Sequence, residues 1–296
     1  MRKTVKWISQ VMEDFGSTMV LSILPALKPF YRAALAKQQA EVSRFGAYLG
    51  DMIREHQFSG EVTTIADGFK KSAAAIPEEE LAEVGMKRED LDLVAVDLYG
   101  AGVFDTSENI HWWLVLLAAH PECQEAILKE IEAHESAHRP TTSDGADMSE
   151  LAYSMATLLE TMRFACTTPL GMPHATTADV PLAQWTIPKG TGVLANSWVI
   201  HKNPAIFPQP HAYQPERFLK DGAVDAKLAG ELFVFGAGGR RCIGESFAKQ
   251  MMFILTLNLL KEFRVELDPD TPGNPLEHTF VFTLQPGPHK LIFRKR

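Results

Sequence analysis

The chain has few cysteines and no hydrophobic run long enough to cross a membrane. Its 296 residues include three cysteines, Cys123, Cys166 and Cys242, whose spacing shows no pairing. This argues against a disulfide framework and against a zinc site. The most apolar stretch, Met251 to Leu260, is too short to span a bilayer and contains Asn258. We therefore expect a reduced, cytosol-facing chain with no membrane anchor and no signal peptide of its own.

Positive charge is also scarce. The chain has 29 Lys and Arg residues against 37 Asp and Glu residues, which gives a formal net charge of -8. This balance argues against general binding of nucleic acid. The hydrophobic content of 46% can form a substantial core, in one large domain or in two.

Cys242 carries the strongest chemical signal. It lies in the glycine-rich segment Phe235-Gly-Ala-Gly-Gly-Arg-Arg-Cys-Ile-Gly244, directly before an apolar-periodic run at 246–263 that predicts a helix. A thiol just ahead of a helix N-terminus, with Arg side chains nearby, is biased towards the thiolate form. A thiolate in this setting suits a soft metal ligand.

Three interpretations of this segment compete. The simplest is a structural loop whose glycines allow positive φ at a turn. The second is a phosphate-binding loop, but a dinucleotide motif needs glycine where Arg241 stands, and a P-loop needs Gly-Lys-Ser/Thr where Gly-Arg-Arg stands. The third is haem ligation by the cysteine thiolate, with Arg240 on a haem propionate.

The segment matches a known signature at every fixed position. Phe235, Gly238, Arg240, Cys242 and Gly244 fill the pattern Phe-x-x-Gly-x-Arg-x-Cys-x-Gly, so the sequence resembles the cytochromes P-450. The resemblance implies a heme b cofactor whose iron takes its axial thiolate from Cys242. It also implies a mostly α fold with small antiparallel β-sheets, lacking the N-terminal helices and first sheet of the longer family members.

A second motif lies upstream. The region 147–165 has helical periodicity, opens with the capping-box-like Asp147-x-x-Glu150 and contains Glu160-Thr-Met-Arg163. Glu160 and Arg163 share a helix face, although such pairs are common on surfaces. The segment Tyr213-Gln-Pro-Glu-Arg-Phe218 resembles the family's Pro-Glu-Arg-Phe segment, which implies that Arg217 joins the pair. The resulting charge network is expected to hold the cysteine loop and to take no chemical step.

The region 91–120 predicts one long apolar helix, interrupted at Gly100-Ala-Gly-Val-Phe-Asp-Thr-Ser107. It resembles the family's central helix, and Asp105 and Thr106 are then the catalytic acid-alcohol pair that relays protons. A gapless alignment from His120-Pro121 puts Phe104 in place of the acid, so this assignment needs a one-residue slip. The alternative is a helix-bending polar pair, in which Thr106 bonds to a carbonyl one turn earlier.

Between residues 167 and 193, proline and glycine residues separate short runs of Val, Ile and Thr, which predicts short antiparallel strands. By resemblance, His174 lies on a strand at the haem edge and binds a propionate. Apolar residues at the positions that face the substrate in the family suit either a lipophilic substrate or an ordinary hydrophobic core. The substrate-pocket candidates are Ala101, Gly102, Phe104, Leu170, Gly171 and Val281.

The resemblance covers only the second half of the family pattern. It implies a single, partial haem-thiolate domain over 1–296. Within it we expect roof-like helices in 1–60, among them Val5 to Phe15 and Tyr31 to His56. The central distal helix follows at 91–120, the Glu-x-x-Arg helix at 147–165, and the cysteine loop with its following helix at 233–263.

The implied function is that of a haem-thiolate monooxygenase, which inserts one oxygen atom from dioxygen into a lipophilic substrate. Electrons come from NADPH through a flavoprotein reductase, or from a ferredoxin-type donor, which would dock near Arg240, Arg241 and Lys249. The motif sequences are similar to those of animal microsomal members. This resemblance implies a location at the cytosolic face of the endoplasmic reticulum membrane. The alternatives are a haem-thiolate isomerase or peroxide-using enzyme, and a truncated, non-catalytic chain with impaired haem binding.

Overall fold

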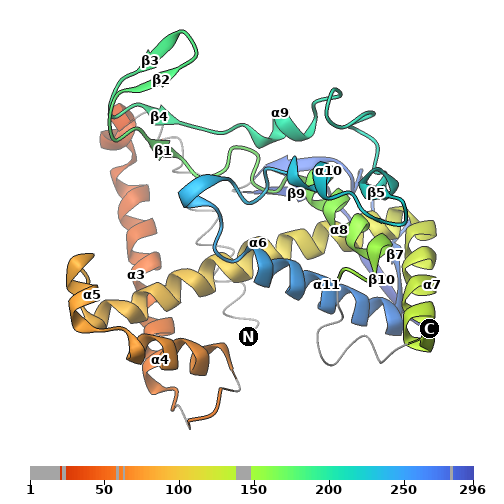
Figure 1. Ribbon diagram of the computed structural model, residues 1–296, viewed down its shortest axis with the longest axis horizontal. Coiled ribbons are helices and arrows are strands. Elements are labelled where there is room, and N and C mark those ends of the chain that lie inside the picture. Colours follow the sequence, from red (N-terminus) through yellow and green to blue (C-terminus); the bar gives the residue numbers. More distant parts are fainter. Residues whose placement is uncertain (1–20, 22–24, 58–59, 63, 138–147, 281–282) are drawn as a thin grey trace. The chain divides into compact units, whose positions relative to one another are not determined.

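The computed structural model describes residue 21 and residues 25–57, 60–62, 64–137, 148–280 and 283–296 (Figure 1). The chain divides into two compact units, Met1–Phe104 and Asp105–Arg296. The division falls inside helix α6, Leu91–Ala119. None of the helices in these ranges is both long and apolar enough to cross a membrane.

The first unit is helical, and both ends of its helix α4 are satisfied by side chains. It contains η1 (Pro25–Tyr31), α3 (Arg32–Glu55), α4 (Ile65–Ala75), α5 (Glu78–Glu83), η2 (Arg88–Asp90) and the start of α6. Thr64 and Asp67 form a reciprocal capping box at the start of α4. The Arg88 guanidinium donates to the carbonyl oxygens of Ala73 and Ile76 at 2.7 and 2.6 Å, which satisfies the end of α4. The predicted helix at 31–56 corresponds to α3, whereas Val5 to Phe15 lies outside the described residues.

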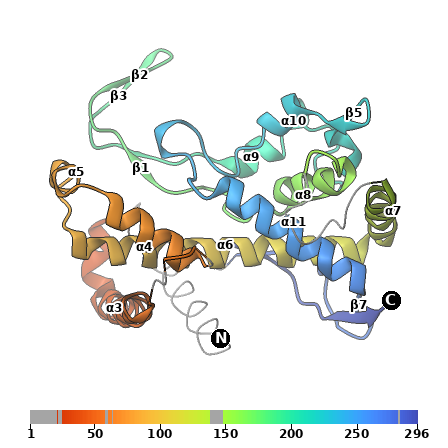
Figure 2. The same cartoon turned by 60° about the horizontal axis from the view of Figure 1, so that its bottom comes forward.

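The second unit is built around α8. After the rest of α6 come α7 (Pro121–Ala137), α8 (Ala152–Ala165), α9 (Ser197–His201), η3 (Pro215–Phe218), α10 (Ala226–Gly230), η4 (Gly238–Arg240) and α11 (Glu245–Glu262). α8 packs against α7, α11, η3 and the hairpin of β5 (Leu219–Lys220) and β6 (Ala223–Val224). Two views show α8 close to α7 and α11 (Figure 1, Figure 2). Nearly every residue of α8 is buried because neighbours cover it on several sides.

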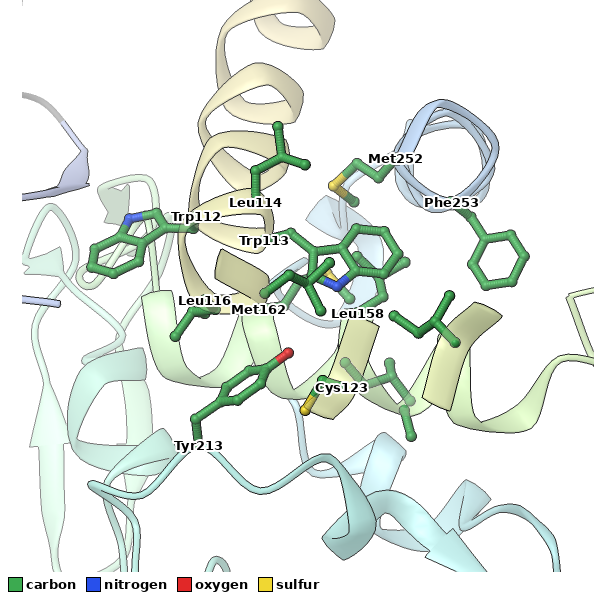
Figure 3. Packing of buried hydrophobic residues seen from close by; sticks show 14 of the residues in the cluster. Trp112, Trp113, Leu114, Leu116, Cys123, Leu158, Met162, Tyr213, Met252 and Phe253 are labelled. Atoms are coloured by element: carbon green, nitrogen blue, oxygen red, sulfur yellow. The ribbon is translucent and has the colours of Figure 1, made fainter. Parts of the chain in front are cut away.

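The core of the second unit is rich in aromatic side chains (Figure 3). Trp112 and Trp113 of α6 are completely buried, and so is Phe253 of α11. Both indole N–H groups are satisfied: Trp112 donates to the carbonyl oxygen of Leu284 at 2.8 Å, and Trp113 donates to the Thr157 hydroxyl at 3.2 Å. Because the polar end of each tryptophan has a partner, its large apolar surface can be buried without an unsatisfied donor.

The strands form small antiparallel pairs within the second unit. β1 (His174–Ala175) pairs with β4 (Gly192–Val193), and β2 (Val180–Leu182) with β3 (Trp185–Ile187). The remaining pairs are β5 (Leu219–Lys220) with β6 (Ala223–Val224), β8 (His278–Phe280) with β9 (Leu284–Pro286), and β7 (Phe263–Leu267) with β10 (Leu291–Lys295). This confirms the predicted mostly α class with small antiparallel β-sheets.

Two local predictions differ from the structure. α6 is one continuous helix, so the interruption predicted at Gly100 to Ser107 is wrong; glycine lowers helix propensity but can stay helical inside a long helix. The capping box predicted at 147–150 does not start α8, which begins at Ala152. Instead the Glu130 carboxylate of α7 accepts from the backbone N–H groups of Tyr153 and Ser154 at 2.7 and 2.8 Å. A carboxylate from another helix satisfies the first turn and complements its positive dipole end.

Candidate functional site

Glu160, Arg163 and Arg217 come together in a fully satisfied charge network. Arg163 donates to both Glu160 carboxylate oxygens, at 2.7 and 2.8 Å, and both side chains are completely buried. Arg217 donates from Nε to Glu160 Oε1 at 3.1 Å. Three carbonyl oxygens, those of His201, Pro210 and Ala212, accept the other Arg163 N–H groups. Buried charges of this kind are tolerated only when every group is paired.

The network connects α8 to the segment that leads into the cysteine loop. His201, whose carbonyl oxygen binds Arg163, has a completely buried ring that accepts from the backbone N–H of Phe233 at 3.0 Å. Sequence reasoning missed His201, because no periodic or motif signal marks it. Two hydrogen bonds, Arg163 to the His201 carbonyl and Phe233 N–H to the His201 ring, therefore link the network to the residues just before the cysteine loop. They support the prediction that the network holds this loop.

The cysteine loop is a tight backbone turn at the start of α11. Gly236 and Gly238 have φ of 69° and 68°, a region that favours glycine. The Cys242 N–H donates to the Phe235 carbonyl oxygen at 2.8 Å, which closes the loop. α11 begins at Glu245, immediately after Gly244. Cys242 thus lies just ahead of the N-terminus of α11.

The surroundings of the thiol fit a haem. Cys242 is exposed, and the next residue, Ile243, is 87% exposed, while Phe247 on the first turn of α11 is 47% exposed. Exposed apolar side chains around a thiol offer contact to a flat apolar macrocycle. Arg241 forms an ion pair with Glu245 at 2.7 Å, whereas the described residues provide no such partner for exposed Arg240. Arg240 is therefore the arginine that remains available for a propionate.

The predicted basic docking face is partly neutralised. Arg241 and Lys249 both bind the carboxylate of Glu245, and the Lys249 ammonium also lies 5.3 Å from the centre of the Phe235 ring. These bonds lower the pKa of Glu245, first through the hydrogen bond with Arg241. Because Glu245 stays ionised, this trio carries one net positive charge and Arg240 adds a second.

Asp105 is an unusual carboxylic acid in α6. Its Oδ1 atom is buried and has no hydrogen-bond partner in the described part of the chain. Burial, with a smaller contribution from the charge of Glu108, raises the pKa of Asp105 to about 6. Asn109, which sequence reasoning also missed, binds the Asp105 carbonyl oxygen at 2.9 Å and the Thr167 hydroxyl at 3.2 Å. Thr106 follows on the same helix and is half-buried.

His174 and the predicted pocket residues occupy different parts of the structure. His174 is exposed in β1, opposite Val193 of β4. Leu170 and Gly171 are half-buried in the segment before β1, and Gly171 has a φ of 57°. Three other candidates belong to the first unit: Ala101 and Gly102, which are exposed, and Phe104, which is buried. Val281 lies outside the described residues, and the role of all these side chains in a pocket stays a prediction.

Comparison with known proteins gives a consistent result. The model of the family described as Cytochrome P450 matches residues 1–293. Cytochrome P450 2U1 of Bos taurus is 34% identical over 253 residues, which is 84% of this chain and 46% of that protein. The steroid 17-alpha-hydroxylase/17,20 lyase of Squalus acanthias is 29% identical over 298 residues, 98% of this chain and 58% of that protein. The chain spans about half the length of the curated relatives it matches.

A solved structure has a similar fold. The chain resembles a zebra fish cytochrome P450 solved with abiraterone, with a TM-score of 0.78 and 26% sequence identity. The match covers 98% of this chain and 65% of that chain. The similarity therefore extends over both units of the chain but not over the whole of the solved protein.

Proposed function

Because this chain belongs to the cytochrome P450 family, we propose that it is a haem-thiolate monooxygenase or the thiolate-bearing segment of one. It inserts one oxygen atom from dioxygen into a lipophilic substrate, with electrons from NADPH through a reductase. The observation that carries this proposal is the exposed thiol of Cys242 just ahead of α11, with the exposed side chains of Ile243 and Phe247 next to it in the sequence. When bound, the haem would supply dioxygen activation, which a thiolate ligand promotes by donating electron density.

The chain's own residues hold and orient the cofactor. Cys242 is the metal ligand, and the N–H bond from Cys242 to the Phe235 carbonyl fixes the direction of the loop. Arg240 and His174, both exposed, bind propionates. Glu160, Arg163 and Arg217 keep the preceding segment in place and take no chemical step.

Asp105 and Thr106 supply protons. A carboxylic acid with a pKa of about 6 is present in both protonation states near neutral pH, so Asp105 can release a proton and take one back. The unpartnered Oδ1 atom leaves one carboxyl oxygen available to a water or to the Thr106 hydroxyl. This property favours the dioxygen-dependent reaction over the peroxide-using or isomerase alternative, because only the former needs a proton relay.

The substrate and the partner are proposed by class. The half-buried Leu170 and Gly171 contribute to a site for a lipophilic molecule. The relatives include a protein named as a steroid hydroxylase, which agrees with a lipophilic substrate. A flavoprotein reductase docks near Arg240, Arg241 and Lys249. Kinship with microsomal members supports a reaction at the cytosolic face of the endoplasmic reticulum.

Turnover assays test this proposal against its alternatives. The monooxygenase oxidises substrate only with NADPH, reductase and dioxygen together, and Cys242→Ser abolishes the reaction. Product formed with hydrogen peroxide alone would instead identify a peroxide-using enzyme, and product isomeric with the substrate would identify an isomerase.

A second candidate is a non-catalytic chain that binds haem weakly. It is favoured by the exposure of Cys242, Arg240 and His174 and by the match to about half of each curated relative. Haem content after purification decides between the two. One haem per chain supports the enzyme, whereas loss of haem on gel filtration supports the non-catalytic chain.

A further inference from the structure

Three ionisable side chains follow one another along α6 at intervals of three residues: Asp105, Glu108 and His111. Residues three apart are neighbours on a helix surface, so each side chain adjoins the next. Their exposure falls in one direction. The side chain of His111 is 40% exposed, that of Glu108 is 16% exposed, and the Oδ1 atom of Asp105 is buried. The row therefore leads from solvent to the acid that the proposed function assigns to proton transfer.

A chain of hydrogen bonds fixes which nitrogen of His111 carries a proton. His289, in the connection between β9 and β10, has its Nδ1 atom 2.8 Å from the carbonyl oxygen of Gly287, which can only accept. Nδ1 of His289 therefore carries the proton, and the neutral ring has its lone pair at Nε2. This lone pair accepts from the Nε2–H of His111 at 2.8 Å. In the neutral ring of His111 the remaining lone pair is then at Nδ1.

The Nδ1 lone pair of His111 faces a carboxyl oxygen that also lacks a proton donor. Oε2 of Glu108 lies 3.7 Å from His111 Nδ1, is buried and accepts no hydrogen bond within the described ranges. Oε1 of Glu108 accepts from the amide of Gln285 in β9 at 3.3 Å. One proton between Nδ1 and Oε2 satisfies both atoms, either on a cationic His111 or on a neutral Glu108. Both forms use the same positions of the heavy atoms, so the proton can change sides with little rearrangement.

Glu108 is coupled to Asp105 on its other side. After burial, the charge of Glu108 is the second cause of the raised pKa of Asp105, and it is the charged group that acts on Asp105 in the described part of the chain. Two neighbouring carboxyl groups resist being ionised together, so a proton on either one relieves the repulsion. Each acid also has one buried oxygen without a partner among the described residues. These oxygens are free to give and to take a proton.

We propose that His111 and Glu108 supply Asp105 with protons from solvent, an inference that rests on the proposed function. His111 takes a proton from water at Nδ1 and gives it to Oε2 of Glu108. Glu108 passes a proton to Oδ1 of Asp105 once Asp105 has released its own. Each step moves one proton and no electrons, directly after a short approach of the side chains or through one water. His111 and Glu108 act through Asp105, so they are positioning residues for its proton.

Carboxyl ¹³C spectra of the haem-free full chain test the coupling of the two acids. Glu108→Gln removes a charge that raises the pKa of Asp105, so the titration of Asp105 should move to lower pH. Glu122→Gln is the matched control, because Glu122 also adjoins a histidine, His120 at 3.1 Å, and should leave this titration unchanged. An unchanged titration of Asp105 in Glu108→Gln would overturn the proposal.

Turnover in the presence of added proton donors tests the relay itself. At equal haem content, His111→Ala and Glu108→Gln should each slow NADPH-dependent oxidation about tenfold, whereas Glu122→Gln should match the wild type. In His111→Ala, a small buffer acid that does not bind haem iron, such as phosphate at constant ionic strength, should restore the rate. The wild-type rate should not respond to phosphate. A loss caused only by altered packing would not be restored in this way.

The outcomes separate this proposal from the proposed function. Far-UV circular dichroism identifies a misfolded variant, in which case the other variant decides. A wild type that turns over no faster than the folded variants would overturn the relay alone, and so would a slow His111→Ala that phosphate does not restore. A haem-loaded wild type with no NADPH-dependent turnover would instead refute the proposed function, and the relay with it.

Discussion

The ring of His201 accepts a hydrogen bond from the backbone N–H of Phe233 at 3.0 Å, deep inside the second unit. Burial, together with the nearby charges of Arg163 and Lys202, lowers the pKa of His201 to about 4. The imidazole is therefore neutral at pH 7 and its Nε2 atom is available as an acceptor. Since the His201 carbonyl oxygen binds Arg163, this one residue joins the buried charge network to the approach of the cysteine loop.

Replacing His201 tests this connection. In His201→Leu the buried Phe233 N–H loses its acceptor, so the free energy of unfolding should fall by about 1–3 kcal/mol in urea titrations. His201→Gln, which keeps an acceptor oxygen, should recover part of that loss. Equal stability of the wild type and the leucine variant would show that the hydrogen bond does not support the segment.

The charge network should be far more sensitive than a surface pair. Arg163→Gln leaves the Glu160 carboxylate buried without its bidentate partner, and we expect a loss of about 3–5 kcal/mol. Arg294→Gln is the control, because it breaks the exposed ion pair with Glu266 and should leave the stability nearly unchanged. Chemical denaturation of both variants gives the comparison, and similar losses would contradict the structural role of the network.

The pKa of Asp105 predicts a pH dependence of stability. Its carboxyl titrates near 3.8 when unfolded and at about 6 when folded, so the unfolded state loses its proton first. The contribution of Asp105 to stability is therefore complete below pH 3.8 and is lost as the pH rises through 6. Asp105→Asn should be more stable than wild type by about 1–3 kcal/mol at pH 8, with no advantage at pH 4.

Urea unfolding between pH 4 and pH 8 measures this difference. Asp270→Asn, at an exposed position, serves as the control and should show no comparable pH-dependent gain. If the advantage of Asp105→Asn were the same at every pH, the burial of the carboxyl would not be its cause. The same variant should lower turnover, since an amide cannot relay the proton.

The two adjacent arginines of the cysteine loop should behave differently towards haem. Arg240→Gln removes the cation proposed to bind a propionate, and haem affinity should fall about tenfold. Arg241→Gln breaks only the ion pair with Glu245 and should leave haem affinity within about twofold. Haem titration followed by absorbance compares them, and an equal effect of both variants would refute the assignment of Arg240.

The sequence predicts the local parts of this site and misses those that depend on distant contacts. Cys242, Glu160 and Arg163 are found because short motifs and helical spacing place them. His201 is missed because its partner Phe233 lies 32 residues away and comes close only in the folded chain. The capping of α8 is mispredicted for the same reason, because its first turn is capped by Glu130 of α7 and not by residues next to it in the sequence.

The positions of proline and glycine predict the short strands of this chain better than they predict breaks in its helices. The proline and glycine residues between 167 and 193 correctly predict short strands, and β1 begins at His174. Two glycines, Gly100 and Gly102, suggest a helix break, yet α6 continues through them. A strong apolar helix on the C-terminal side, with buried Trp112 and Trp113, offsets the low helix propensity of two glycines.

The proposed function depends above all on ligation of a haem iron by the thiol of Cys242. A carbon monoxide difference spectrum of the reduced, haem-supplemented chain tests it most directly, with Cys242→Ser and with Cys123→Ala as a control for a buried thiol. We expect a red-shifted Soret band of the thiolate type in wild type and in Cys123→Ala, and its loss in Cys242→Ser. A wild-type chain that binds haem without this band, or a band that survives in Cys242→Ser, would contradict it.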